Sequence, residues 1–138
     1  MRQSLPGIIS IHSVECSRLQ PQLMIRAMAG LPNSVFAPTT QINFVGEPTC
    51  ITVSKYNNGG RSEKTTIELN STEWLDITTP LAFIVKCVNG DVFLVGKKEK
   101  QYPTISVNHT TGTTTSDASI YKIEISYIAT KTLIPIKF

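Results

Sequence analysis

Apolar and polar residues alternate along several stretches of this chain with the two-residue period of a β-strand. The clearest stretch is residues 120–129, where one face carries Tyr121, Ile123, Ile125, Tyr127 and Ala129. Because successive side chains of a strand point to opposite faces, this pattern predicts a half-buried antiparallel strand. Shorter strands are expected at residues 8–16, 22–28, 41–45, 49–56, 64–69, 82–88, 91–95 and 104–107.

Two tight turns join some of these strands into hairpins. Residues 57–60, Asn-Asn-Gly-Gly, separate one pair of strands, and Asn89-Gly90 separates another. Asn and Gly accept the positive φ angles that a two-residue hairpin turn needs. The runs 82–85 and 92–95, which flank the second turn, are apolar at every position. Such strands are usually covered on both faces, so this hairpin is expected to lie at the centre of the fold.

The composition agrees with a fold made of strands. The chain contains 16 Ile, 9 Val and 17 Thr, against only 6 Ala and 9 Leu. β-Branched side chains are stiff at the first torsion, which disfavours helix and suits a pleated sheet. Residues 71–77 hold the only expected helical turn, capped by Ser71, and the Thr-rich residues 110–117 are expected to form an exposed loop. The predicted fold is all-β, an antiparallel β-sandwich or β-barrel with at most one short helix.

Length and charge limit the classes of protein to consider. With 138 residues the chain is expected to form one β domain over residues 1–138. Thirteen Lys and Arg against ten Asp and Glu are too small an excess to indicate a nucleic-acid partner. The longest apolar stretch, residues 81–88, is far shorter than the about 20 residues of a membrane span. The first residues lack the apolar core of a signal peptide, so we expect synthesis in the cytoplasm.

Few residues offer chemistry. His12 and His109 lie in different regions, and no His or Cys pair has the spacing of metal ligands. Cys16, Cys50 and Cys87 are far apart and are expected to be small buried side chains in a reducing compartment. We also find no paired carboxylates and no phosphate-binding loop. The sequence therefore predicts no enzyme activity, no catalytic residue, no metal, no cofactor and no small-molecule substrate.

Aromatic residues leave one alternative open. A carbohydrate-binding sandwich needs exposed aromatic side chains that offer flat apolar faces to a sugar. Most aromatic residues of this chain fall on expected core faces, and only Trp74 and Tyr102 lie in expected loops. A monomeric β-sandwich that acts as a binding module, for example for carbohydrate, is the alternative to a structural role.

The second half of the chain carries a family resemblance. It rests on the turn 57–59, the strand 64–69, the apolar run 81–85, the hairpin 88–96 and the closing residues 131–135. From about residue 54 to the C-terminus, the chain resembles small all-β proteins found among tail and other virion genes of bacteriophages and prophages in gut bacteria. The resemblance implies a virion structural protein, a tail, tail-terminator or head–tail connector subunit that assembles as a homo-oligomeric ring or tube. Its partners would be other copies of itself and neighbouring virion proteins, and it would be made in the host bacterial cytoplasm.

The C-terminal residues 131–138 are apolar for the end of a chain. Pro135 has no backbone N–H, so this segment is expected to be an edge strand or an extended arm. Burying a large apolar side chain is worth about 1.5 to 3 kcal/mol, which argues against a solvated tail. The segment either packs on the core of its own chain or docks as an arm on a neighbouring subunit. In the second case the interface residues are Leu133, Ile134, Ile136 and Phe138.

Overall fold

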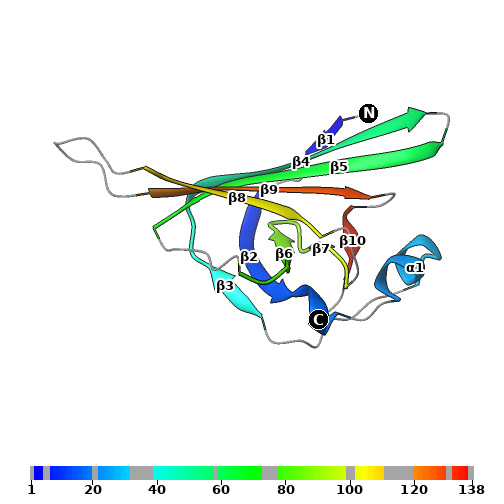
Figure 1. The fold of residues 1–138 in the computed structure, drawn as a ribbon, viewed down its shortest axis with the longest axis horizontal. Coiled ribbons are helices and arrows are strands. Elements are labelled where there is room, and N and C mark those ends of the chain that lie inside the picture. The colour runs from blue at the N-terminus through cyan, green and yellow to red at the C-terminus, as the bar shows by residue number, and fades with distance from the viewer. Residues whose placement is uncertain are drawn as a thin grey trace.

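In the part of the chain that the structure describes, two antiparallel sheets of five strands each face each other (Figure 1). The computed structural model describes residues 2–4, 7–19, 22–31, 39–57, 59–72, 78–98, 102–110, 120–129 and 132–136. The sheets do not close into a barrel. The predicted all-β class is confirmed, and of its two forms the structure is the sandwich.

The first sheet, sheet A, contains the long strands. Its order is β1-β4-β5-β9-β8, and each strand runs antiparallel to its neighbours. The strands are β1 (Arg2–Ser4), β4 (Val45–Asn57), β5 (Gly60–Ser71), β9 (Ile120–Ala129) and β8 (Thr104–Thr110).

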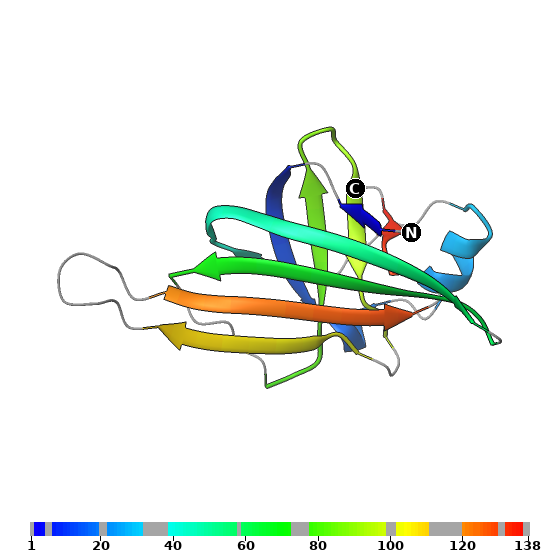
Figure 2. The ribbon, with the colours of Figure 1, turned by 90° about the horizontal axis from the view of Figure 1, so that it is seen from above.

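The second sheet, sheet B, contains shorter strands in the order β10-β7-β6-β2-β3. They are β10 (Ile134–Pro135), β7 (Val92–Val95), β6 (Leu81–Cys87), β2 (Ile8–Glu15) and β3 (Thr40–Ile42). The strands of sheet B run across those of sheet A rather than along them (Figure 2). Sheet A is longer in its strand direction, so both of its ends extend past sheet B.

The core lies between the two sheets, with the β6–β7 hairpin in the middle of sheet B. Five consecutive residues of β6, from Leu81 to Val85, are buried, so this strand is covered on both faces as its apolar run predicts. β9 presents Ile123, Ile125 and Tyr127 to the core, and these side chains are at most 1 % exposed. The alternation in residues 120–129 therefore predicted the correct inward face.

Both predicted hairpins are confirmed. Asn57 pairs with Gly60 at the end of the β4–β5 ladder, and Gly60 has a φ of 111°. In the β6–β7 turn, Gly90 has a φ of 94° and the Asn89 side chain accepts a hydrogen bond from the Asp91 N–H at 3.1 Å. Asn-Gly thus supplies both the positive φ angle and a local hydrogen bond at this turn.

The prediction of a strand at residues 22–28 is wrong, because a short helix, α1 (Leu23–Met28), forms there. Its sequence, Leu-Met-Ile-Arg-Ala-Met, contains a single β-branched residue among strong helix formers. The Arg26 N–H donates to the Gln22 carbonyl at 2.9 Å, and Gly30 follows the helix with a φ of 75°. Helix propensity therefore outweighed the apolar pattern that suggested a strand.

Other boundaries also differ from the prediction. β1 at residues 2–4 and a 3-10 turn at Cys16–Arg18 were not expected. β8 runs on to Thr110, so the expected loop at residues 110–117 begins later, and the remainder of it lies outside the described residues. Ser71 ends β5, and residues 73–77 of the expected helical turn also lie outside the described residues.

Candidate functional site

The C-terminal segment packs on its own chain. Ile134 is fully buried and Ile136 is 6 % exposed, and both belong to a cluster between β6, β7 and the segment after β2. β10 pairs with β7, and the Ile136 N–H donates to the Val92 carbonyl at 3.1 Å. Leu133 is half-buried against the main core, and Phe138 lies outside the described residues.

This placement corresponds to the first of the two alternatives for residues 131–138. β10 is an edge strand, as Pro135 predicts, and the buried side chains of Ile134 and of Ile136, which follows the strand, have almost no surface left to offer a partner. An interface formed by Leu133, Ile134, Ile136 and Phe138 on a neighbouring subunit stays a prediction. It would require this segment to leave its own sheet first.

Three buried threonines tie the C-terminal segment to sheet A. The Thr65 hydroxyl donates to Thr132 Oγ1 at 2.5 Å and shares a second hydrogen bond with the Thr52 hydroxyl at 2.8 Å. Thr65 and Thr132 are fully buried, and Thr52 is 4 % exposed. These hydroxyls satisfy one another in a place without access to water, which fixes the position of the chain before β10.

Glu63 joins the same region from β5. Its Oε1 accepts the backbone N–H of Thr132 at 3.2 Å, and its Oε2 accepts from Arg61 Nη2 at 2.8 Å and from the Ser54 hydroxyl at 3.2 Å. The Glu63 side chain is only 11 % exposed, whereas that of Arg61 is 51 % exposed. Glu63 therefore connects β4, β5 and the C-terminal segment through one carboxylate.

The β4–β5 hairpin extends beyond its neighbouring strands. β1 pairs with β4 only as far as Val53, and β9 pairs with β5 only from Glu63 onward. Residues 55–57 and 60–62, called the hairpin tip below, therefore form a two-stranded ribbon that no other described strand borders. The tip lies at the same end of the molecule as α1 (Figures 1 and 2).

The hairpin tip and α1 each carry exposed apolar side chains. Tyr56 is 78 % exposed, although it shares the face of β4 that carries the buried Thr52. On and just after α1, Ile25 is 70 % exposed, Met28 63 % and Leu31 51 %. Large exposed apolar side chains are common in contact surfaces between proteins.

The cysteines are poor nucleophiles because they are buried. Cys16, Cys50 and Cys87 are free thiols, each at most 3 % exposed. Burial raises the pKa of Cys16 to about 11, and burial followed by the neighbouring Cys87 raises that of Cys50 to about 12. The pKa of Cys87 is raised by burial and then by Asp91. Since the thiolate is the reactive form, these thiols stay inert at neutral pH.

The two histidines lie on strands of different sheets, His12 on β2 and His109 on β8. His12 is half-buried on β2, and the side chain of His109 lies outside the described residues. Among the described residues, no group of three His, Cys, Asp or Glu side chains could hold a metal ion. The hydroxyl of Tyr127 is buried without a hydrogen-bond partner among these residues, and burial, then Cys16, raises its pKa to about 12.

We expect the protein to lose stability as the pH rises above about 9. In the unfolded chain the thiols ionise near 9.0, whereas the fold keeps Cys16 protonated to about 11 and Cys50 to about 12. In that window the folded state binds more protons, so the free energy of unfolding falls by about 1.4 kcal/mol per pH unit for each thiol. Urea unfolding at several pH values under reducing conditions measures this slope. Cys50→Ala should reduce this slope by the contribution of one thiol. A free energy of unfolding that stays constant to pH about 10.5 would contradict the prediction.

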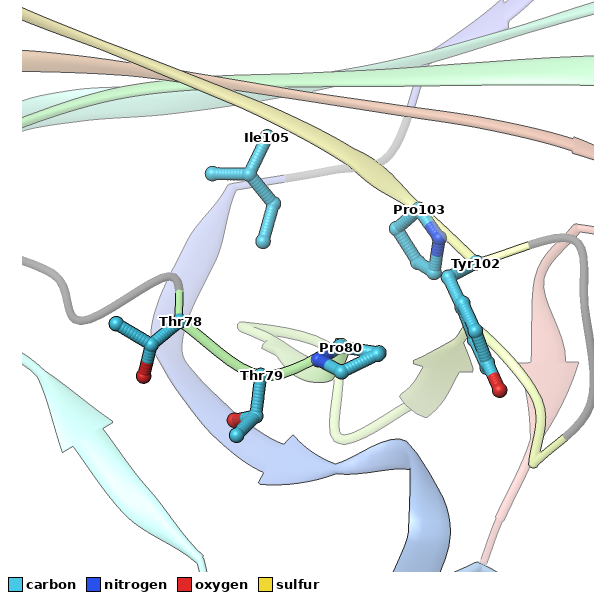
Figure 3. Close-up of a pocket in the computed structure, with 6 residues that line it drawn as sticks. All are labelled: Thr78, Thr79, Pro80, Tyr102, Pro103 and Ile105. Carbon is cyan, nitrogen blue, oxygen red and sulfur yellow. The ribbon is translucent and has the colours of Figure 1, made fainter.

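A shallow recess opens beside β8 (Figure 3). Its volume is about 320 Å³, and none of the residues that line it is charged. Tyr102 stands at one side of the recess, but Trp74, the other aromatic residue expected in a loop, lies outside the described residues. The recess is lined by Thr78, Thr79, Pro80, Tyr102, Pro103 and Ile105.

None of the helices in the described ranges is long and apolar enough to cross a membrane.

No similar protein identifies the chain. No protein-family model, no curated protein and no solved structure matches the sequence or the fold. A function must therefore be argued from the geometry of this chain.

Sequence patterns did not indicate Glu63 or the three threonines as linked residues. Thr52 and Thr65 face inward in two strands that the hairpin turn pairs, so their contact could have been found by extending the register from Asn57 and Gly60. No local signal placed Thr132 beside them, because it lies 67 positions from Thr65 in the sequence.

Proposed function

We propose that this protein is a non-catalytic structural subunit of a bacteriophage virion. It assembles with copies of itself into a ring or tube of the tail, the tail terminator or the head–tail connector, next to other virion proteins. The class is the one that the resemblance of residues 54–138 implies, and the geometry below is the support for assembly. The buried, protonated thiols also suit a protein that works through its surfaces.

The hairpin tip is the observation that carries the proposal. A two-stranded ribbon that extends past its neighbours has little stability of its own and gains from a partner surface. The exposed Tyr56 on the tip and the exposed Ile25 and Met28 of α1 lie at one end of the subunit. Contacts from one end of a subunit to a different surface of the next are heterologous, and such contacts close into rings or continue as tubes.

A monomeric binding module is the second candidate, and the recess in Figure 3 favours it. Tyr102 could stack on a sugar ring there, and the Thr78 and Thr79 hydroxyls stand on the opposite side. A monomer that binds a glycan, and loses that binding in Tyr102→Ala, would replace the assembly proposal.

We expect Tyr56→Ser to abolish assembly into rings or tubes and to leave the fold intact. The Tyr56 side chain is 78 % exposed, so its loss should change the free energy of unfolding by no more than about 0.5 kcal/mol. Light scattering and negative-stain imaging of the full chain measure the assembly. Val88→Ser is the matched control, because Val88 is 63 % exposed at the other hairpin turn. A wild-type protein that stays monomeric, or a Tyr56→Ser variant that assembles normally, would contradict the proposal.

A further inference from the structure

The edge strands of the two sheets differ in how well they are protected. Exposed edges usually avoid pairing with other chains by being short, by carrying Pro or Lys, or by bulging. β1 and β3 have three residues each, and β10 has two residues, one of which is Pro135. The fourth edge strand, β8, has none of these features.

β8 is long, regular and uncharged. Its seven residues, Thr-Ile-Ser-Val-Asn-His-Thr, pair with β9 without interruption from Thr104 to Thr110. No described strand pairs with its other edge. Figure 2 shows β8, in yellow, as the outermost strand along that side of sheet A. An edge of this kind is a template for another strand.

Apolar and polar residues of β8 follow the same order in both directions from Ser106. If two copies pair antiparallel with Ser106 opposite Ser106, then Ile105 lies opposite Val107 and Thr104 lies opposite Asn108. Apolar positions thus meet apolar positions on the inner face, and polar positions meet polar positions on the outer face. Cross-strand pairs of β-branched residues stabilise a sheet, and no like charges meet in this register.

The inner face of β8 is incompletely covered in the single chain. Ile105 and Val107 are only half-buried, although both pack against the main core. Ile105 also lines the recess of Figure 3. In the proposed register, Val107 of a second copy lies about 5 Å from Ile105 on the same face, so it would enter the side of the recess.

We infer that β8 binds β8 of a second copy of this chain, antiparallel and about a two-fold axis at Ser106, so that two A sheets become one continuous sheet. The inference follows from β8 alone and does not depend on the virion proposal. Since one strand per copy contributes less area than a standard interface of about 1,600 Å², the dimer should be weak and should depend on concentration.

Cysteine cross-linking of the full chain tests the register. Directly opposed residues have Cα atoms about 4.5 to 5.5 Å apart, within the range of a disulfide. Ser106→Cys should therefore form a disulfide-linked dimer under a mild oxidant. Thr104→Cys is the matched control, because Thr104 is also exposed on the outer face of β8. Two copies of residue 104 would lie about 13 Å apart in this register, too far for a disulfide.

A second pair of variants checks the same register independently of Ser106→Cys. A mixture of Thr104→Cys and Asn108→Cys should cross-link, whereas neither variant should do so alone. The native thiols do not interfere, because Cys16, Cys50 and Cys87 are buried. Sedimentation of the wild type should show a monomer–dimer equilibrium. A wild type that is monomeric at its highest soluble concentration would overturn the inference. Equal cross-linking of residues 104 and 106 would also overturn it.

Discussion

A chain that stops at Lys131 is expected to be unfolded at 25 °C. The truncation removes two buried Ile side chains, Ile134 and Ile136, and the fully buried Thr132 that accepts a hydrogen bond from Thr65. Losing a buried Ile costs about 2 to 5 kcal/mol, and the whole stability of a domain is about 5 to 15 kcal/mol. Circular dichroism and urea unfolding measure the loss.

Single substitutions in β10 show how much of the stability comes from its buried side chain. Ile134→Ala should lower the free energy of unfolding by about 2 to 5 kcal/mol, because Ile134 is fully buried. Pro135→Ala, at the exposed neighbouring position, should change it by about 1 kcal/mol or less. A truncated chain that stays folded and loses only its assembly would instead support a docking arm formed by residues 131–138.

The fold class could be predicted because each strand carries its own signal. The alternation of residues 120–129 and the Asn-Gly turns act within a few positions, so they give strand faces and hairpin registers without knowledge of the rest of the chain. The same local reasoning failed at residues 22–28. An apolar run of that length is compatible with helix and strand alike, and Leu, Met and Ala favour the helix.

The candidate surfaces could be predicted only in part. The apolar C-terminal residues indicated burial, but not whether their own chain or another supplies the covering surface. The structure adds the long-range partners, such as Glu63 for the Thr132 N–H, 69 positions apart. The exposed hairpin tip depends on where β1 and β9 stop pairing, which is a property of the assembled sheet. Sequence periodicity carries no information on that.

Glu63→Ala is expected to be the most damaging substitution of a charged residue in β5. It leaves the backbone N–H of the fully buried Thr132 without its acceptor, and an unsatisfied buried donor costs about 1 to 3 kcal/mol. The lost pair with Arg61 adds little, because the Arg61 side chain is half exposed and such pairs are worth about 0 to 1 kcal/mol. A total loss of about 2 to 3 kcal/mol in urea unfolding is expected.

Glu68→Ala is the matched control, on the same strand but on its exposed outer face. Glu68 lies directly opposite Glu124 of β9, so its removal relieves a like-charge contact and should leave the stability unchanged or slightly higher. Glu63→Gln keeps an acceptor oxygen for the Thr132 N–H, so its loss of stability should lie between those of Glu63→Ala and Glu68→Ala.

Because Glu63 holds the C-terminal segment at the base of the hairpin tip, Glu63→Ala should also speed hydrogen exchange in β10 and in the adjoining ends of β4 and β5. Equal effects of Glu63→Ala and Glu68→Ala on stability and exchange would show that the carboxylate of Glu63 does not fix this segment.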